Sequence, residues 1–170
     1  TIWCQYVAVK RENLCFALGG EYIENVYVTQ GQLVKAGDIL AELKQDDLKE
    51  QIAFREYQIK VIELKIKHLK EDWKQETLKQ DVKFHAITDE LVAERDAYRE
   101  KVEALKEEYE QQLQTLEDSK YIENLYLEEL KQELSSRQIV AGIDGTVTYV
   151  CNVKDGQRSK EGEVFIKISD

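Results

Sequence analysis

The sequence contains no proline and no methionine, and none of its eight glycines falls between residues 46 and 135. Proline inside a helix costs about 3 kcal/mol and glycine about 1 kcal/mol, so this stretch favours long unbroken helices. Long apolar runs are also lacking: no segment approaches the roughly 18 residues that cross a bilayer, and no signal-peptide pattern is present. We therefore expect an excised segment, with any anchor of the parent protein outside it.

Positive charge is scarce, with 24 Lys and Arg against 34 Asp and Glu, a net charge of -10. Binding to nucleic acid needs clustered basic side chains, so a nucleic-acid partner is not expected. Residues 46–135 hold 24 of the acidic and 15 of the basic residues, which places most of the acidity in the helical stretch.

Cysteine is limited to Cys4, Cys15 and Cys151, without a CxxC pair or a nearby histidine cluster. An odd number argues against a disulfide framework, and we expect small buried apolar residues. In an oxidising compartment, a Cys4–Cys151 or Cys15–Cys151 bridge is the alternative. The pattern predicts no metal site and no cofactor.

Candidate catalytic groups are few. His68 is expected on a solvated helix flank, and His85 in a turn or cap. Acid pairs such as Asp46/Asp47, Glu107/Glu108 and Glu128/Glu129 have helix-surface spacing, whereas acid–base catalysis needs convergent, partly desolvated carboxylates. The sequence therefore predicts no catalytic residues and no enzyme.

The two ends of the chain are related copies. A shift of 125 residues superposes Gly20 on Gly145, Gly31 on Gly156 and Gly37 on Gly162 without a gap. These six glycines are expected at structural turns. Each copy predicts two strands, at 22–28 and 39–43 and again at 147–153 and 164–168. Because about 30 residues cannot bury a core alone, the copies should pack face to face as a small β-sandwich, each supplying one apolar face.

The middle of the chain predicts two helices. In the first half, apolar residues recur at steps of three and four and form a heptad seam, with Arg55 at its one polar position. Its apolar members are Leu48, Ile52, Ile59, Ile62, Ile66, Leu69 and Trp73. The seam of the second half contains Leu91, Tyr98, Val102, Leu105, Tyr109, Leu113, Leu116, Leu127, Leu130 and Leu134. Its spacing slips near Leu113 and blurs over 117–125, which indicates a stutter or local kink; a broken helix capped by Asp118-Ser119 is the alternative.

Both ends of the helical stretch join the same sandwich, so the two helices must be antiparallel. The turn is predicted at Phe84–Ile87. Thr88 should be the N-cap of the second helix, with Asp89 and Glu90 in its first turn. The first helix, about 46–85, should be about 60 Å long. The fold class is α+β: a small β-sandwich split by a long antiparallel two-helix coiled-coil hairpin.

Both arms resemble the half-motifs of a lipoyl domain in HlyD-type membrane fusion proteins. The first arm carries Gly20, then Val26-Tyr27-Val28, then the pattern G-x-x-V-x-x-G-x-x-L from Gly31 to Leu40. Residues 139–147 resemble the entry to the second half, with Ala141-Gly142 where the family has Ala-Pro. The resemblance implies a barrel-sandwich hybrid with halves 15–45 and 136–170, a hairpin 46–135 with its tip at about 84–90, and a strand within 1–14 leading in from a further domain.

The resemblance also implies a function. Proteins of this type are non-enzymatic adaptors of export and efflux transporters, extracytoplasmic and membrane-anchored in the full-length protein. Expected partners are an inner-membrane transporter, with an ABC pump preferred, other copies in a ring such as a hexamer, and an outer-membrane channel or other envelope partner. The tip residues Phe84, His85, Ile87, Thr88 and Leu91 would contact that outer partner, with Phe84, Ile87 and Leu91 as exposed apolar side chains, unless the tip is an ordinary turn.

The Arg–Leu–Ser tip pattern of channel-docking adaptors is not present, since Thr77, Asp81 and Thr88 occupy its positions. This indicates a different tip contact or a cell without an outer membrane.

Two alternatives belong to other classes. One is a structural coiled-coil protein whose β-domain only holds the helices together. The other is a lipoyl or biotinyl carrier, which modifies a lysine in the tight turn between its halves. Here the helical stretch replaces that turn, and Lys44 is not placed in one.

Overall fold

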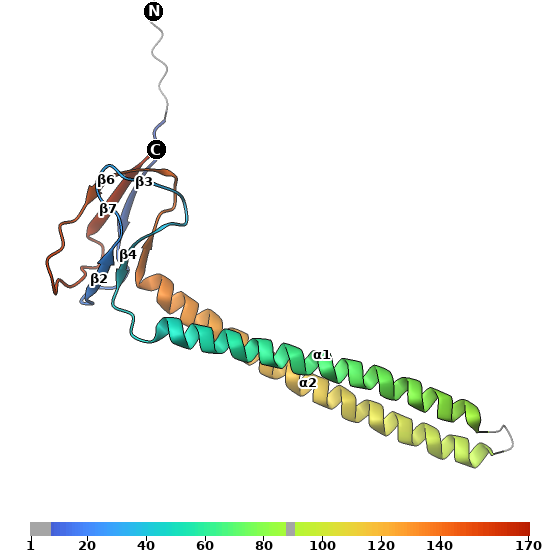
Figure 1. Cartoon of the computed structure of the whole chain (residues 1–170). Helices are drawn as coiled ribbons and strands as arrows, with labels where there is room; N and C mark the ends of the chain where they lie inside the picture. Colours follow the sequence, from blue (N-terminus) through green and yellow to red (C-terminus); the bar gives the residue numbers. More distant parts are fainter. Residues whose placement is uncertain (1–7, 88–90) are drawn as a thin grey trace, which may run out of the picture. The chain divides into compact units, whose positions relative to one another are not determined.

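A computed structural model describes residues 8–87 and 91–170 (Figure 1). The chain forms two compact units. We call the part up to residue 51 and from residue 129 the β-unit, and residues 52–128 the hairpin unit. The elements in chain order are β1 (Arg11–Cys15), β2 (Ile23–Val26), β3 (Leu33–Val34), β4 (Ile39–Leu43), α1 (Leu48–Ala86), α2 (Val92–Ser136), β5 (Gln138–Val140), β6 (Gly145–Val150) and β7 (Val164–Ser169).

The β-unit consists of two antiparallel sheets, with strand orders β1-β7-β6-β3 and β2-β4-β5. The predicted α+β class, antiparallel sheets together with a helical hairpin, is confirmed. The expectation that each copy supplies one apolar face is wrong, because the copies exchange strands. β3 of the first copy pairs with β6, and β5 of the second pairs with β4. Each sheet therefore needs both ends of the chain.

The core lies between these sheets and draws on both copies. Its largest fully buried side chains are Phe16, Leu40, Leu43, Val147, Ile166 and Ile168. The rings of Phe16 and Phe165 lie 4.8 Å apart between centroids. β4 follows the predicted bounds, and four of its five residues are buried, which is why its sequence is nearly continuous in apolar residues.

The glycines serve two different purposes. Gly31 and Gly156 have φ values of 91° and 76°, a region that other residues rarely adopt. Gly145, expected in a turn, instead begins β6, where an added Cβ would lie 2.5 Å from the carbonyl oxygen of Ser169. This glycine lets β6 and β7 approach each other.

The N-terminal strand belongs to the larger sheet, and the cysteines differ in part from expectation. Arg11–Cys15 forms β1 and pairs with β7 as the edge of that sheet, while a lead-in from a further domain stays a prediction. Cys15 is exposed at the end of this edge strand, so its expected burial is wrong. Cys151 is half-buried against the core, and both thiols are free. Cys4 lies outside the described residues.

The two helices are continuous. The alternative of a break at Asp118-Ser119 is wrong, since Ser119 Oγ donates to the carbonyl of Thr115 within α2. α1 begins after Asp47, whose carbonyl accepts from the amide of Gln51. α2 begins at Val92, and the expected cap Thr88, with Asp89 and Glu90, lies outside the described residues. Neither helix, over its described length, carries a stretch apolar enough to traverse a lipid bilayer.

Candidate functional site

The hairpin unit is held by a seam between α1 and α2. Arg55 contacts Glu123, 68 residues away in sequence, whereas Tyr98 contacts Gln80, only 18 residues away. Sequence separation therefore shrinks toward the turn, as an antiparallel pair requires. Ile59 is buried in this seam.

A polar layer interrupts the seam. Arg55 Nη1 donates to both carboxylate oxygens of Glu123, at 2.9 and 3.0 Å, and its guanidinium lies 4.7 Å from the ring centroid of Tyr126. A second ion pair, Lys120–Glu63 at 3.1 Å, also joins the two helices. The blurred pattern over 117–125 is thus explained by Glu123 occupying a seam position, and no kink is needed. In the sequence, Arg55 was the signal for this ion pair, because a charged residue in an apolar seam requires a partner of opposite charge on the facing helix.

Aromatic residues replace the aliphatic seam farther along. Trp73 stacks on Tyr109 with centroids 4.7 Å apart and planes 8° from parallel. The hydroxyl of Tyr98 donates to the carbonyl of Gln80 at 3.1 Å and also to the side-chain oxygen of Gln80. Desolvation raises the pKa of Tyr98, and the nearby charge of Glu76 raises it further.

Near the turn, Phe84 packs against Tyr98 and lies under two guanidinium groups, those of Arg95 and Arg99, at 4.8 and 5.5 Å. Phe84 is consequently half-buried, which corrects the expectation of an exposed tip residue. A groove of roughly 400 Å³ opens beside it, lined by Trp73, Thr77, Gln80, Val102 and Leu105 among others. Most of its exposed lining is apolar, and Asp81, Arg99 and Glu103 also line it.

Three other predicted tip residues, His85, Ile87 and Leu91, lie within the described part of the chain. His85 lies in the last turn of α1, where Nδ1 is 2.8 Å from the carbonyl oxygen of Asp81. The amide of Ile87 donates to the carbonyl of Phe84, and Leu91 immediately precedes α2 with 44% of its surface exposed. Thr88 lies outside the described residues. His68 is exposed, and across residues 8–87 and 91–170 no cluster of His, Cys, Asp and Glu could hold a metal ion.

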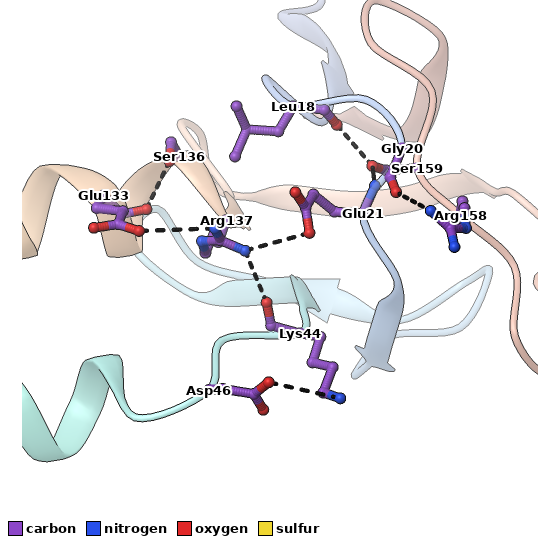
Figure 2. A network of polar contacts seen from close by, with 10 residues as sticks. All are labelled: Leu18, Gly20, Glu21, Lys44, Asp46, Glu133, Ser136, Arg137, Arg158 and Ser159. Carbon is purple, nitrogen blue, oxygen red and sulfur yellow. Dashed lines mark hydrogen bonds and ion pairs between the residues drawn. The ribbon is translucent and has the colours of Figure 1, made fainter.

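A second polar cluster, which we call the base network, lies in the β-unit (Figure 2). Arg137 is the single residue between α2 and β5. Its Nη1 donates to the carbonyl of Lys44 at 3.0 Å, and its guanidinium pairs with Glu21 at 3.6 Å and Glu133 at 3.7 Å. One side chain from the second copy thus binds two segments of the first and the end of α2.

Ser159 and Arg158 extend the base network. Ser159 is buried; its Oγ donates to the carbonyl of Leu18 at 2.7 Å and accepts from the amide of Glu21 at 3.2 Å. Arg158 donates to the carbonyl of Gly20 at 3.1 Å and to the hydroxyl of Tyr22 at 2.9 Å. These bonds join the two copies where the chain leaves for the helices (Figure 2).

Glu42 is a buried carboxylate in β4 that sequence reasoning missed, because a lone acid in an apolar strand gives no sign of its partners. It accepts hydrogen bonds from Tyr27 at 3.0 Å, Gln45 at 3.2 Å and Gln138 at 3.0 Å, and Lys49 Nζ lies 3.5 Å away. The hydrogen bond to Glu42 raises the pKa of Tyr27, with desolvation and the charge of Glu42 acting in the same direction. Glu42 therefore ties β4 to β5 and to the start of α1.

No protein-family model matches the sequence, and no curated protein matches it either. Among solved structures, MacA from Actinobacillus actinomycetemcomitans matches with a TM-score of 0.55 and 17% identity, over 97% of this chain and 57% of MacA. The fold is that of a membrane fusion protein. This membrane fusion fold spans little more than half of MacA.

Two further matches are the periplasmic adaptor protein EmrA and a membrane fusion protein from Streptococcus pneumoniae. Their TM-scores are 0.41 and 0.44, with 15% and 14% identity. The matches cover 95% and 94% of this chain, and 73% and 65% of the respective proteins.

Proposed function

We propose that this chain is the lipoyl-and-hairpin part of a non-enzymatic adaptor for a membrane export or efflux transporter. The observation that supports it is the β-unit itself, in which strands from both ends of the chain share two sheets and adjoin the start of α1 and the end of α2. MacA shares this fold. In the full-length protein, we propose an extracytoplasmic position with a membrane anchor.

The role we propose is mechanical. At 1.5 Å per residue, the 39 residues of α1 extend about 58 Å and the 45 residues of α2 about 68 Å. A seam with stacked aromatics and an internal ion pair keeps these helices together, while a charged exterior keeps them hydrated. Such a rod spans distance between partners and makes or breaks no bond.

The partners we propose are an inner-membrane transporter, with an ABC pump preferred, and other copies of the chain in a ring. The hairpin tip, comprising the ends of both helices near His85, Ile87, Thr88 and Leu91, would bridge to an outer-membrane channel, another envelope protein or the extracellular space. Leu91 is the most useful probe of this contact, because it is exposed and carries no described tertiary bond beyond its backbone.

The test is purification of the tagged full-length protein from detergent-solubilised native membranes, with its partners identified by mass spectrometry. We expect a transporter subunit to co-purify. Leu91→Asp should retain the transporter and lose an outer partner, while Leu78→Asp, a change at another exposed leucine of the hairpin, should retain both. Membranes that yield the adaptor without any enriched transporter would contradict the proposal.

A further inference from the structure

A polar pocket lies on the outer face of the larger sheet of the β-unit. β7 turns Ile166 and Ile168 toward the core, and exposes Lys167 between them on the opposite face. On that face the pocket has a volume of roughly 400 Å³ and is lined by Arg11, Asn13, Thr148, Lys167, Ile168 and Ser169. Three neighbouring strands, β1, β7 and β6, therefore contribute to one pocket.

The strand register brings the two cations of this pocket together. Asn13 lies opposite Lys167 in the antiparallel ladder, and Arg11 lies opposite Ser169. Directly opposite residues share one face of a sheet, and so do alternate residues of one strand. Arg11 and Lys167 are therefore diagonal neighbours on the outer face, with backbones about 7–8 Å apart. An anion between these two long side chains can contact both.

An irregularity in β6 shapes another side of the pocket. The register with β7 shifts between Val147 and Tyr149, and the side chains of Thr148 and Tyr149 are both exposed. A bulge of this kind redirects side chains locally. Nζ of Lys167 lies 5.6 Å from the ring centroid of Tyr149, and the hydroxyl of Thr148 donates to the carbonyl of Lys167 at 3.3 Å. β6 thus holds Lys167 through both its amine and its backbone.

The hydrogen-bond donors of the pocket are not used by the protein. Among residues 8–87 and 91–170, no hydrogen bond or ion pair involves the side chains of Arg11, Asn13 or Ser169. In the same part of the chain, the amine of Lys167 contacts only the ring of Tyr149. A guanidinium, an ammonium, an amide and a hydroxyl are therefore available together, and each can donate to an oxygen of a ligand.

The acidic residues nearest in sequence do not neutralise the pocket. Glu12 points to the other face of β1, where its carboxylate accepts from the amide of Gly142. Asp144 accepts from the amide of Ala36. Asp170 follows the last residue of β7, and no described acidic residue lines the pocket. Two positive charges therefore stand together in a chain whose net charge is -10.

We propose that this pocket binds the phosphate group of a small soluble ligand, with phosphate oxygens between the guanidinium of Arg11 and the ammonium of Lys167. A phosphate monoester carries about 1.5–2 negative charges at pH 7 and three acceptor oxygens, which matches two cations and two neutral donors. The planar guanidinium can bind two of these oxygens at once. A carboxylate would bring one charge and leave donors unused. The site goes beyond the adaptor function and does not depend on it.

The first test titrates the 170-residue chain with glycerol phosphate at low salt by isothermal titration calorimetry. Arg11→Ala and Lys167→Ala should each weaken binding about tenfold, because each removes a charge-assisted contact. Lys154→Ala is the matched control: it removes an exposed lysine of the β-unit outside the pocket and should leave binding unchanged. Circular dichroism verifies that each variant remains folded. Equal weakening by Lys154→Ala and Lys167→Ala would show general charge attraction and overturn the proposal.

The second test locates the bound phosphate by amide NMR. Glycerol phosphate should shift the backbone amides of Asn13, Thr148 and Lys167, and acetate at the same ionic strength should bind at least about tenfold more weakly. Vesicles containing phosphatidic acid present the same group on a lipid. The proposal would be overturned by binding to these vesicles alone, by shifts confined to other residues, or by a dissociation constant for glycerol phosphate weaker than about 10 mM.

Discussion

The guanidinium of Arg55 and the carboxylate of Glu123 meet within the hairpin seam, at 2.9 and 3.0 Å, with only 32% and 20% of their side-chain surfaces exposed. Partial desolvation makes each charge dependent on the other. The pair also fixes the register of the two helices, because a shift along the seam would leave both charges facing apolar neighbours.

Removing one partner of this pair should therefore cost more than removing an exposed ion pair. We expect Glu123→Ala to lower the free energy of unfolding by about 1–2 kcal/mol, and Lys120→Ala by less than about 1 kcal/mol. The double variant Arg55→Leu with Glu123→Leu should be at least as stable as the parent, since it extends the apolar seam. Urea unfolding followed at 222 nm measures all three. Equal losses for Glu123→Ala and Lys120→Ala would show that the seam position is not desolvated.

The stack of Trp73 on Tyr109 should be a major contributor to hairpin stability. Trp73→Ala removes the largest side chain of the seam, and we expect a loss of about 3 kcal/mol in unfolding free energy. Trp73→Phe should recover most of it. Thermal unfolding with Leu78→Ala as the exposed control is the measurement, and a loss no larger than that of the control would refute a packed stack.

Two glycine substitutions should differ in severity. Gly145→Ala would drive a methyl group against the backbone of Ser169, where neither strand can retreat without losing ladder bonds. In Gly31→Ala the added methyl group has no neighbour within 4 Å. The folded state is destabilised only by the left-handed φ of alanine, by about 1 kcal/mol. We expect a clearly lower Tm for Gly145→Ala than for Gly31→Ala, by differential scanning calorimetry. The reverse order would indicate that β6 and β7 are farther apart than described.

Tyr27 should titrate above the ordinary tyrosine range. Its hydrogen bond to Glu42 is lost when the phenol ionises, so the folded state holds the proton more tightly than the unfolded chain, which ionises near pH 10. The corresponding stability is complete below pH 10 and declines as the pH rises through the pKa of the folded state. Absorbance at 295 nm should show Tyr27 and Tyr98 titrating late, and only the Tyr27 component should shift to lower pH in Glu42→Gln and disappear in Tyr27→Phe. An unchanged profile in Glu42→Gln would exclude the hydrogen bond as the cause.

Lys44 should remain unmodified in cells competent for lipoylation and biotinylation. It follows β4 and leads into α1, and its amide donates to the carbonyl of Tyr22, so it is not presented on a tight turn between two strands. Intact-mass measurement should give the unmodified mass. An adduct of lipoyl or biotinyl size on one lysine would favour the carrier alternative.

The sequence was sufficient to predict the architecture because its strongest signals are local. Heptad steps, the lack of glycine and proline, and glycines in register each depend on near neighbours. The exchange of β3 and β5 between sheets could not be predicted in this way. It depends on which backbone edges meet across more than 90 residues, as Leu33 does with Thr146.

The errors at individual residues have a similar origin. Cys15 was expected inside because cysteine usually behaves as a small apolar residue, but its side of edge strand β1 faces solvent. Glu123 blurred the second seam because its partner Arg55 lies on the other helix, so neither pattern is complete alone. Phe84 was expected at an exposed tip, but it packs against Tyr98 from α2 and is partly buried.

The exchange of strands has a consequence for how the molecule assembles. Neither terminal arm can form a complete sheet without strands from the other. The helical hairpin must therefore form, and bring residues 138–169 next to the first arm, before either sheet can assemble. Cleaving the chain between Ile87 and Leu91 should therefore leave two fragments that stay associated and refold only as a pair.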